Sequence, residues 1–303
     1  MSTDRVIRVL SGRDGAHVLA LWGLVSLLPG ARLRFDADAI AHLTWDGDDD
    51  ALGVTAARGL VERTWGLGDG LLAGIKTTVP KRSAVNPKTE AEWRAVEQAG
   101  RLPTTSILAV FNAAATGEDK KGKIQDGDLK VVSSALTMLS GRSYTANIVQ
   151  ETWRLLEVED ADGARARAAV EIGRLLDGGL SIASSKPGLR FSAPVTPPRV
   201  ASGSERVDIQ PLVDLLAFTG QLLLSPAQRP FDPAAGDKAL AWVLNPVPLD
   251  LAGLLDLSAA PPRSLAWPRY EAPIVSEGGR ASISALKPAH PVTPASHRGS
   301  PNA

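Results

Sequence analysis

The fold of the N-terminal part of this chain is decided by residues 5–30, RVIRVLSGRDGAHVLALWGLVSLLPG. The first six of these residues alternate and are rich in Val and Ile, which predicts a strand. Asp14 stands where its side chain can cap a following helix. Because residues 16–28 are apolar on nearly every face and end at Pro29-Gly30, they predict a helix that is buried in the core.

Two short strands and a second helix are predicted next. The strands cover Arg32–Phe35 and Ile40–Trp45, and the Asp-rich segment 46–50 supplies a cap for a helix at Ala51–Thr64. The order strand, helix, strand, strand, helix makes up most of a ferredoxin-like (split βαβ) unit. We therefore predict an α+β protein with a ferredoxin-like N-terminal unit.

The rest of the chain is predicted to hold a helical middle and a second, smaller sheet-plus-helix unit. Up to residue 178, we expect helices at 89–98, 104–115, 144–156 and 163–176, a strand at 129–138 and a charged surface loop at 117–128. Further on, we expect a hairpin of 180–183 with 189–192, helices at 211–224 and 249–257, and strands at 207–209, at 239–244 and up to 286. The predicted units are residues 1–116, 117–178 and 179–286, followed by a disordered tail at 287–303.

The composition narrows the classes of function. The chain has 303 residues, no cysteine and a formal net charge of zero, with 33 basic and 33 acidic residues. The lack of cysteine excludes disulfides, thiolate nucleophiles and zinc–thiolate sites, and the lack of net charge restricts any nucleic-acid surface to a local patch. The first residues do not resemble a signal peptide, and the longest apolar stretch, residues 16–29, is too short to span a bilayer. We expect a cytoplasmic protein without membrane contact.

The sequence contains no recognisable catalytic or cofactor motif. The four histidines are His17, His42, His290 and His297. None has the spacing of a metal site, and the acidic run from Asp46 lacks the Gly and Glu of a calcium loop. The glycines from Gly66 to Gly70 do not complete a phosphate-binding motif. We therefore predict a protein that has no enzymatic activity, metal or cofactor and acts by binding.

One segment is a candidate contact with nucleic acid. Ser140, Gly141, Arg142, Ser143 and Tyr144 lie between a predicted strand and a predicted helix. A helix start presents free backbone N–H groups that hold phosphate, Arg142 adds a positive charge, and the Tyr144 ring can stack on a base. The alternative is a helix cap that only reverses the chain. Basic residues that either line the same face or are simply solvated include Lys81, Arg82, Lys120, Lys121 and Lys123.

Four stretches, at the start, in the middle and in the C-terminal part of the chain, resemble a known family. Residues 12–25, GRDGAHVLALWGLV, look like the polar turn and apolar helix that open subunits of type I CRISPR systems. Residues 136–144, LTMLSGRSY, resemble a turn before a helix in those subunits, and residues 211–220 and 241–250 resemble two stretches near their C-termini. Together these segments resemble accessory and large-subunit-like proteins of the type I-G (formerly I-U) subtype. Trp22, Tyr144 and Thr219 depart from the residues that are usual in the family.

This resemblance implies a non-catalytic subunit or accessory factor of an RNA-guided antiviral complex. Such a protein would contact the backbone of guide RNA or target DNA, or dock the helicase-nuclease or other effector subunits. The alternative is a structural module that binds a protein partner through apolar helices and Trp side chains, without nucleic-acid contact. An enzyme with an unfamiliar carboxylate site is a third hypothesis, which a pocket lined by Asp and Arg would favour.

Overall fold

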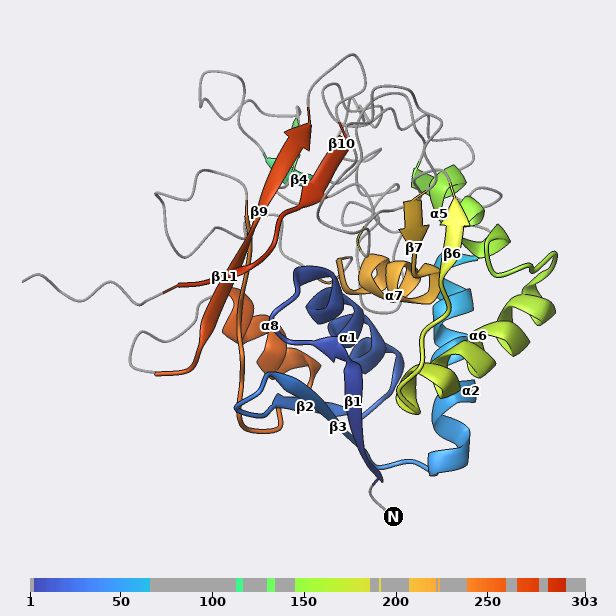
Figure 1. Ribbon diagram of the computed structural model, residues 1–303, viewed down its shortest axis with the longest axis horizontal. Helices are drawn as coiled ribbons and strands as arrows, with labels where there is room; N and C mark the ends of the chain where they lie inside the picture. The colour runs from blue at the N-terminus through green and yellow to red at the C-terminus, as the bar shows by residue number, and fades with distance from the viewer. Residues whose placement is uncertain are drawn as a thin grey trace, which may run out of the picture.

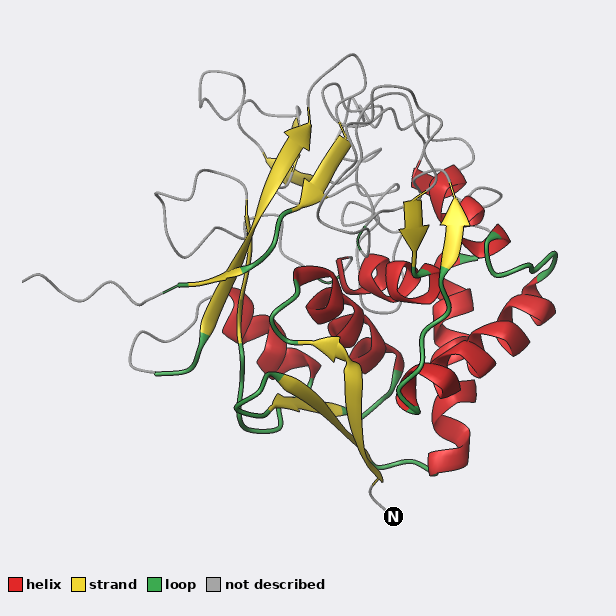
Figure 2. Ribbon diagram, in the orientation of Figure 1, coloured by secondary structure: helices red, strands yellow, loops and turns green. Residues whose placement is uncertain are grey.

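A computed structural model describes residues 3–65, 113–116, 130–133, 145–185, 191, 207–221, 223, 239–259, 266–277 and 283–292. Over these residues the chain is a mixed α+β protein, with six helices and with strands that pair antiparallel (Figures 1 and 2). The α+β class predicted from the sequence is confirmed.

The first five elements follow the predicted order. They are β1 (Thr3–Ser11), α1 (Gly15–Leu27), β2 (Arg32–Phe35), β3 (Ile40–Trp45) and α2 (Asp49–Thr64). Asp14 caps α1, because its carboxylate accepts from the backbone N–H groups of Ala16 and His17 at 2.8 and 3.1 Å. All five predicted elements are confirmed, with boundaries that agree to within about two residues.

These three strands form a sheet in the order β1-β3-β2. β3 pairs antiparallel with both neighbours, so that Ala41 faces Ile7 of β1 and Leu43 faces Leu33 of β2. Helix α1, which connects β1 to β2, packs on the face where these apolar side chains are buried. A complete ferredoxin-like sheet has a fourth strand beside β1. Among the described strands none pairs with that edge, so the ferredoxin-like assignment stays a prediction.

Helix α1 is the centre of the core. All of its residues are buried except His17 and Ser26, as its apolar sequence predicts. The helix lies between the three-stranded sheet and α7 (Pro211–Gln221), whose residues are also all buried (Figure 1). The two helices cross where Gly23 meets Gly220. This crossing ties the N-terminal third of the chain to a segment almost 200 residues away in sequence.

Helices α5 (Thr145–Arg154) and α6 (Ala161–Leu176) continue this helical layer. α6 packs along α2, as the ribbon shows on the right of Figure 1, and α5 contacts α7. Trp153 of α5 is fully buried, and its Nε1–H donates to the Thr64 hydroxyl of α2 at 3.1 Å. Its ring meets that of Trp65 edge to face, with 5.7 Å between ring centroids.

The second sheet is built around one long strand. Its strands are β8 (Ala239–Val243), β9 (Arg269–Glu277), β10 (Ile283–Leu286) and β11 (His290–Pro291), with α8 (Leu251–Ala259) packed against β8. β9 pairs antiparallel with each of the others. The prediction of a disordered tail from residue 287 is wrong for residues 287–292. The backbone N–H groups of Lys287 and Val292 donate to carbonyls of β9 at 2.8 Å, and such pairing across the chain leaves no local pattern.

Two short strand pairs complete the described fold. β4 (Ala113–Thr116) pairs with β5 (Lys130–Ser133), and β6 (Ala183–Ser185) pairs with β7 (Val207–Ile209). The helix predicted over 104–115 is therefore wrong for residues 113–115, where strand pairing overrides the helical preference of alanine. The predicted hairpin is also wrong in its partner, since β6 pairs with β7. The predicted helix at 89–98 and loop at 117–128 lie outside the described residues.

The two sheets are joined by the segment after β8. Leu33 of β2 and Leu249 exchange backbone hydrogen bonds of 2.8 and 3.0 Å, and the N–H of Phe35 donates to the carbonyl of Asn245 at 2.8 Å. Residues 245–249 thus line the edge of β2. One hydrophobic core extends from Ile7 to Ala272 and contains residues of all three predicted units, whose division stays a prediction.

Candidate functional site

The residues predicted to contact nucleic acid lie outside the described part of the chain. These are Ser140, Gly141, Arg142, Ser143, Tyr144, Lys81, Arg82, Lys120, Lys121 and Lys123. Helix α5 begins at Thr145, directly after this predicted turn. The contact at 140–144 therefore stays a prediction. Polar side chains in the described part of the chain form other clusters.

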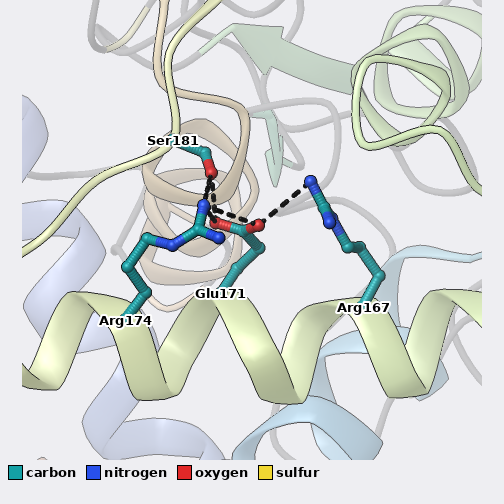
Figure 3. Close-up of polar contacts among 4 residues, drawn as sticks. All are labelled: Arg167, Glu171, Arg174 and Ser181. Atoms are coloured by element: carbon teal, nitrogen blue, oxygen red, sulfur yellow. Dashed lines mark hydrogen bonds and ion pairs between the residues drawn. The ribbon is translucent and has the colours of Figure 1, made fainter.

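The Glu171 cluster consists of Arg167, Glu171, Arg174 and Ser181 (Figure 3). The side chain of Glu171, on α6, is only 1% exposed. Arg167 Nη2 lies 3.2 Å from one carboxylate oxygen, Arg174 Nη1 lies 3.1 Å from both, and the Ser181 hydroxyl donates to the second oxygen. The two guanidinium groups reach solvent, with side chains 39% and 45% exposed.

This arrangement makes the Glu171 cluster a structural tie, by which we mean a set of contacts that holds the segment after α6 against that helix. Both carboxylate oxygens already accept hydrogen bonds, so these bonds and the two arginine charges offset the cost of burying the Glu171 carboxylate. Ser181 follows α6 in the segment that leads to β6, and its bond to Glu171 fixes where that segment leaves the helix. A general base needs a lone pair that faces substrate, and this carboxylate points toward its own arginines and serine (Figure 3).

The hairpin cluster consists of Arg34, Asp36 and His42, at the turn between β2 and β3. Arg34 Nη2 lies 3.1 Å from His42 Nδ1, and His42 Nε2 lies 3.2 Å from a carboxylate oxygen of Asp36. Because a guanidinium group only donates, Nδ1 is the acceptor, and Nε2 carries the proton that is donated to Asp36. The imidazole in this arrangement is neutral, and both of its nitrogens are occupied.

The Asp36 carboxylate also holds the turn itself. Its second oxygen accepts from the backbone N–H groups of Asp38 and Ile40 at 3.0 and 2.9 Å. The bond from Ile40, followed by those from His42 and Asp38, lowers the pKa of Asp36, although partial burial opposes this. Ala39 takes a positive φ of 64° within the same turn. The turn therefore places Asp36 where it orients His42, which in turn orients Arg34.

The two polar residues of α1 each join this helix to a neighbour. His17 Nδ1 accepts from the backbone N–H of Ser11 at the end of β1, at 3.1 Å, and burial lowers the pKa of His17 against the opposing charge of Asp14. Ser26 accepts through its hydroxyl and its carbonyl from Arg63 of α2, at 2.6 and 2.8 Å. Burial lowers the pKa of Arg63 as well. The His17–Ser11 contact and the Ser26–Arg63 contact therefore each fix α1 against a neighbouring element of the core.

Sequence reasoning missed the two clusters, although signals for each are present. Arg167 and Arg174 stand four residues before and three after Glu171, which places all three on one face of a helix. Arg34 and His42 each occupy the polar position of an alternating strand on either side of a turn. Ser181 carried no comparable signal, because its contact depends on the path of the chain after α6.

The described part of the chain offers no further candidate site through metal ligands or a membrane span. Among the residues that the structure describes, no three His, Asp or Glu side chains gather as metal ligands. No helix within the described ranges has both the length and the apolar character needed to cross a membrane. No protein-family model, curated protein or solved structure matches this chain.

Proposed function

We propose that this chain is a non-catalytic binding protein, a subunit or accessory factor of an RNA-guided antiviral complex of the type I CRISPR kind. It contacts the backbone of guide RNA or target DNA, or docks the effector nuclease, in the cytoplasm. The contact predicted at Ser140–Tyr144, with the neighbouring lysines, belongs to this proposal.

One observation carries the proposal: the described segments that resemble the family pack against one another. Residues 12–25 contain α1, residues 211–220 form most of α7, and residues 241–250 contain the end of β8. α1 and α7 cross at Gly23 and Gly220. Trp242 donates from Nε1 to the carbonyl of Gly12 at 2.8 Å, across 230 residues of sequence. Segments that pack closely in one core depend on one another, so a family is expected to retain them together. Their contact therefore supports the view that the resemblance is a single pattern and not a set of unrelated apolar stretches.

The strand order also supports the proposed ferredoxin-like N-terminal unit. β1 and β2 flank β3, both pair with it antiparallel, and α1 connects them across the buried face. This is the arrangement expected of the first half of a split βαβ unit. The proposal requires a fourth strand beside β1, and a structure that places another element there would exclude it.

The nucleic-acid contact is tested by binding at two salt concentrations. The purified chain, alone and with its co-expressed neighbouring gene products, is titrated against single-stranded RNA and duplex DNA at about 50 mM and about 200 mM salt. We expect binding that weakens with salt, and Arg142→Ala to reduce the salt slope by about one. Arg165→Ala is the matched control, because Arg165 is exposed and already paired with Asp162. A chain that binds neither nucleic acid nor any effector subunit contradicts the proposal.

A structural protein-binding module is the second candidate. The apolar side chains of Val54 on α2 and Val170 on α6 are 58% and 56% exposed, which favours contact with a protein. The described tryptophans provide little of the surface that the sequence predicts for this module, since Trp22, Trp45, Trp153 and Trp242 are buried and only Trp65 and Trp267 are partly exposed. Co-purification with a protein partner and never with nucleic acid would select this function.

A further inference from the structure

The three-stranded sheet has one face against the core and one face turned away from it. The inward side chains Ile7, Leu33, Phe35, Ala41 and Leu43 are almost completely buried. The outward positions alternate with these and are half-buried or exposed. They are Asp4, Val6, Arg8, Arg32, Arg34, Ile40, His42 and Thr44. We name this surface the outer sheet face.

Arg34, on the outer strand β2, is held in place by His42 of the central strand. Val6, His42 and Arg34 lie in one row across β1, β3 and β2. The bond from Arg34 Nη2 to His42 Nδ1 fixes the guanidinium over this row, and His42 is itself fixed by Asp36. Because the imidazole that accepts this bond is neutral, it orients the guanidinium without cancelling its charge. Among the described residues, no carboxylate forms an ion pair with Arg34.

The acidic groups near this face are engaged elsewhere or stand at its end. Both oxygens of Asp36 accept bonds from the turn or from His42. Asp46 lies 3.8 Å from Arg32, and Asp4 stands beside Thr44 in the register, at the same end of the sheet. Arg8 is exposed near the other end, where no described carboxylate pairs with it. Arg8 and Arg34 are thus two arginines of this face without a described ion pair, while the carboxylates of Asp36 and of the exposed Asp38 lie at the turn beside them.

We propose that the outer sheet face binds the phosphate backbone of a single-stranded nucleic acid, with Arg34 and Arg8 as the phosphate contacts. This inference rests on the proposed function and names its surface. A guanidinium group presents a fork of donors that matches a phosphate, and one that is already oriented loses less conformational freedom on binding. Arg34 lies on β2 in the same row as Val6 of β1, and Arg8 follows two residues later on β1, where the pairing with β3 is interrupted. The two arginines are therefore separated by more than two strand spacings of about 5 Å each, which fits a chain of phosphates better than a single anion.

The uncharged outward side chains of this face fit the same ligand. Val6 and Ile40 are outward apolar side chains, which can contact ribose or the faces of bases, and Thr44 adds a hydroxyl. The outward positions of this face carry no amide side chain, and their only aromatic ring is the imidazole of His42, which Arg34 and Asp36 already hold. Base-specific contacts depend on such paired donors and acceptors, so we expect binding that is independent of sequence.

Anisotropy titrations with fluorescein-labelled oligouridine test this inference. We expect Arg34→Gln and Arg8→Gln to weaken binding about tenfold each and to lower the salt slope by about one. Arg165→Gln, on α6, is expected to bind within about twofold of the wild type. His42→Asn keeps an acceptor near the position of Nδ1 and should bind like the wild type, whereas His42→Leu should weaken binding. Thermal melting of each variant checks that the fold is retained.

The outcomes separate this inference from the proposed function. If the wild type binds oligouridine and both arginine variants bind like Arg165→Gln, the outer sheet face is not the contact, while the proposed function stands. If only Arg142→Ala weakens binding, the contact lies at Ser140–Tyr144 instead. Binding to duplex DNA without binding to oligouridine overturns the single-stranded ligand, and a wild type that binds no nucleic acid overturns the inference together with the nucleic-acid part of the function.

Discussion

Gly23 of α1 and Gly220 of α7 face each other with no space for a side chain on either. A Cβ atom on Gly23 would lie 2.0 Å from the carbonyl oxygen of Leu216, and one on Gly220 would lie 2.0 Å from that of Leu19. Both obstacles are backbone atoms, so no change of rotamer relieves the clash. Small residues at a crossing allow helix backbones to approach this closely, and here they set the spacing of the two most deeply buried helices.

We expect Gly23→Ala and Gly220→Ala each to lower the free energy of unfolding by about 3 kcal/mol, because the helices must move apart to admit one methyl group. Urea denaturation followed by circular dichroism measures this. Gly173→Ala in α6 is the matched control, since a Cβ there meets nothing within 4 Å. It should raise stability by about 0.5–1 kcal/mol through the better helix propensity of alanine. Equal stability of all three variants would show that α1 and α7 do not meet at these glycines.

Asn245 provides the second test, at the junction of the two sheets. Its side-chain amide donates to the carbonyls of Leu33 and Val247 at 2.6 and 2.9 Å, and the residue is fully buried. Asn245→Asp replaces this donor by a charge that faces two carbonyl oxygens. We expect a loss of about 3 kcal/mol in the free energy of unfolding. Val247→Ala, at a neighbouring side chain that is 45% exposed, should change stability by less than about 0.5 kcal/mol.

The fold was predictable from the sequence where its signals are local. The elements from β1 to α2 follow from alternation, from the cap at Asp14 and from the stop at Pro29-Gly30, all within a few residues of the elements that they define. The pairing of β2 with residues 245–249 could not be predicted this way. It joins segments 212 residues apart, and an Asn side chain that bonds to a distant carbonyl looks in sequence like any loop residue.

The candidate sites also combine features with a local sequence signal and features that depend on long-range packing. The helical spacing of Arg167, Glu171 and Arg174 was visible in the sequence, but the burial of Glu171, which gives the cluster its role, depends on the packing around α6. His42 looked like a packing or surface residue. Only the strand register, which puts Arg34 beside it and Asp36 at its other nitrogen, makes it a residue that positions a charge.

Glu171→Gln tests the role of the Glu171 cluster as a structural tie. The change keeps the shape of the side chain but removes the charge that compensates Arg167 and Arg174. We expect the free energy of unfolding to fall by about 1–3 kcal/mol, an intermediate value because the carboxylate is buried while the arginines are half-exposed. Asp162→Asn removes an exposed carboxylate from the same helix, and it should cost less than about 0.5 kcal/mol. Equal effects of the two changes would contradict the tie.

Because His17 is partly buried, we expect the free energy of unfolding to fall in mild acid. Burial lowers its pKa in the folded protein, with the charge of Asp14 opposing, whereas in the unfolded chain the pKa is about 6.5. The unfolded state therefore binds more protons at acidic pH, so the contribution of His17 is fully present above about pH 6.5 and is lost as the pH falls through the folded pKa. Protonation of Nδ1 also removes the acceptor for the Ser11 N–H.

The measurement is the urea midpoint of the wild type and of His17→Asn between about pH 5 and about pH 8. Asn can accept from the Ser11 N–H but does not titrate, so we expect a smaller fall in midpoint toward acid than in the wild type. His290→Asn, at an exposed position of β11, is the matched control and should follow the wild-type profile. Parallel profiles for wild type and His17→Asn would mean that His17 is not a neutral acceptor for the Ser11 N–H.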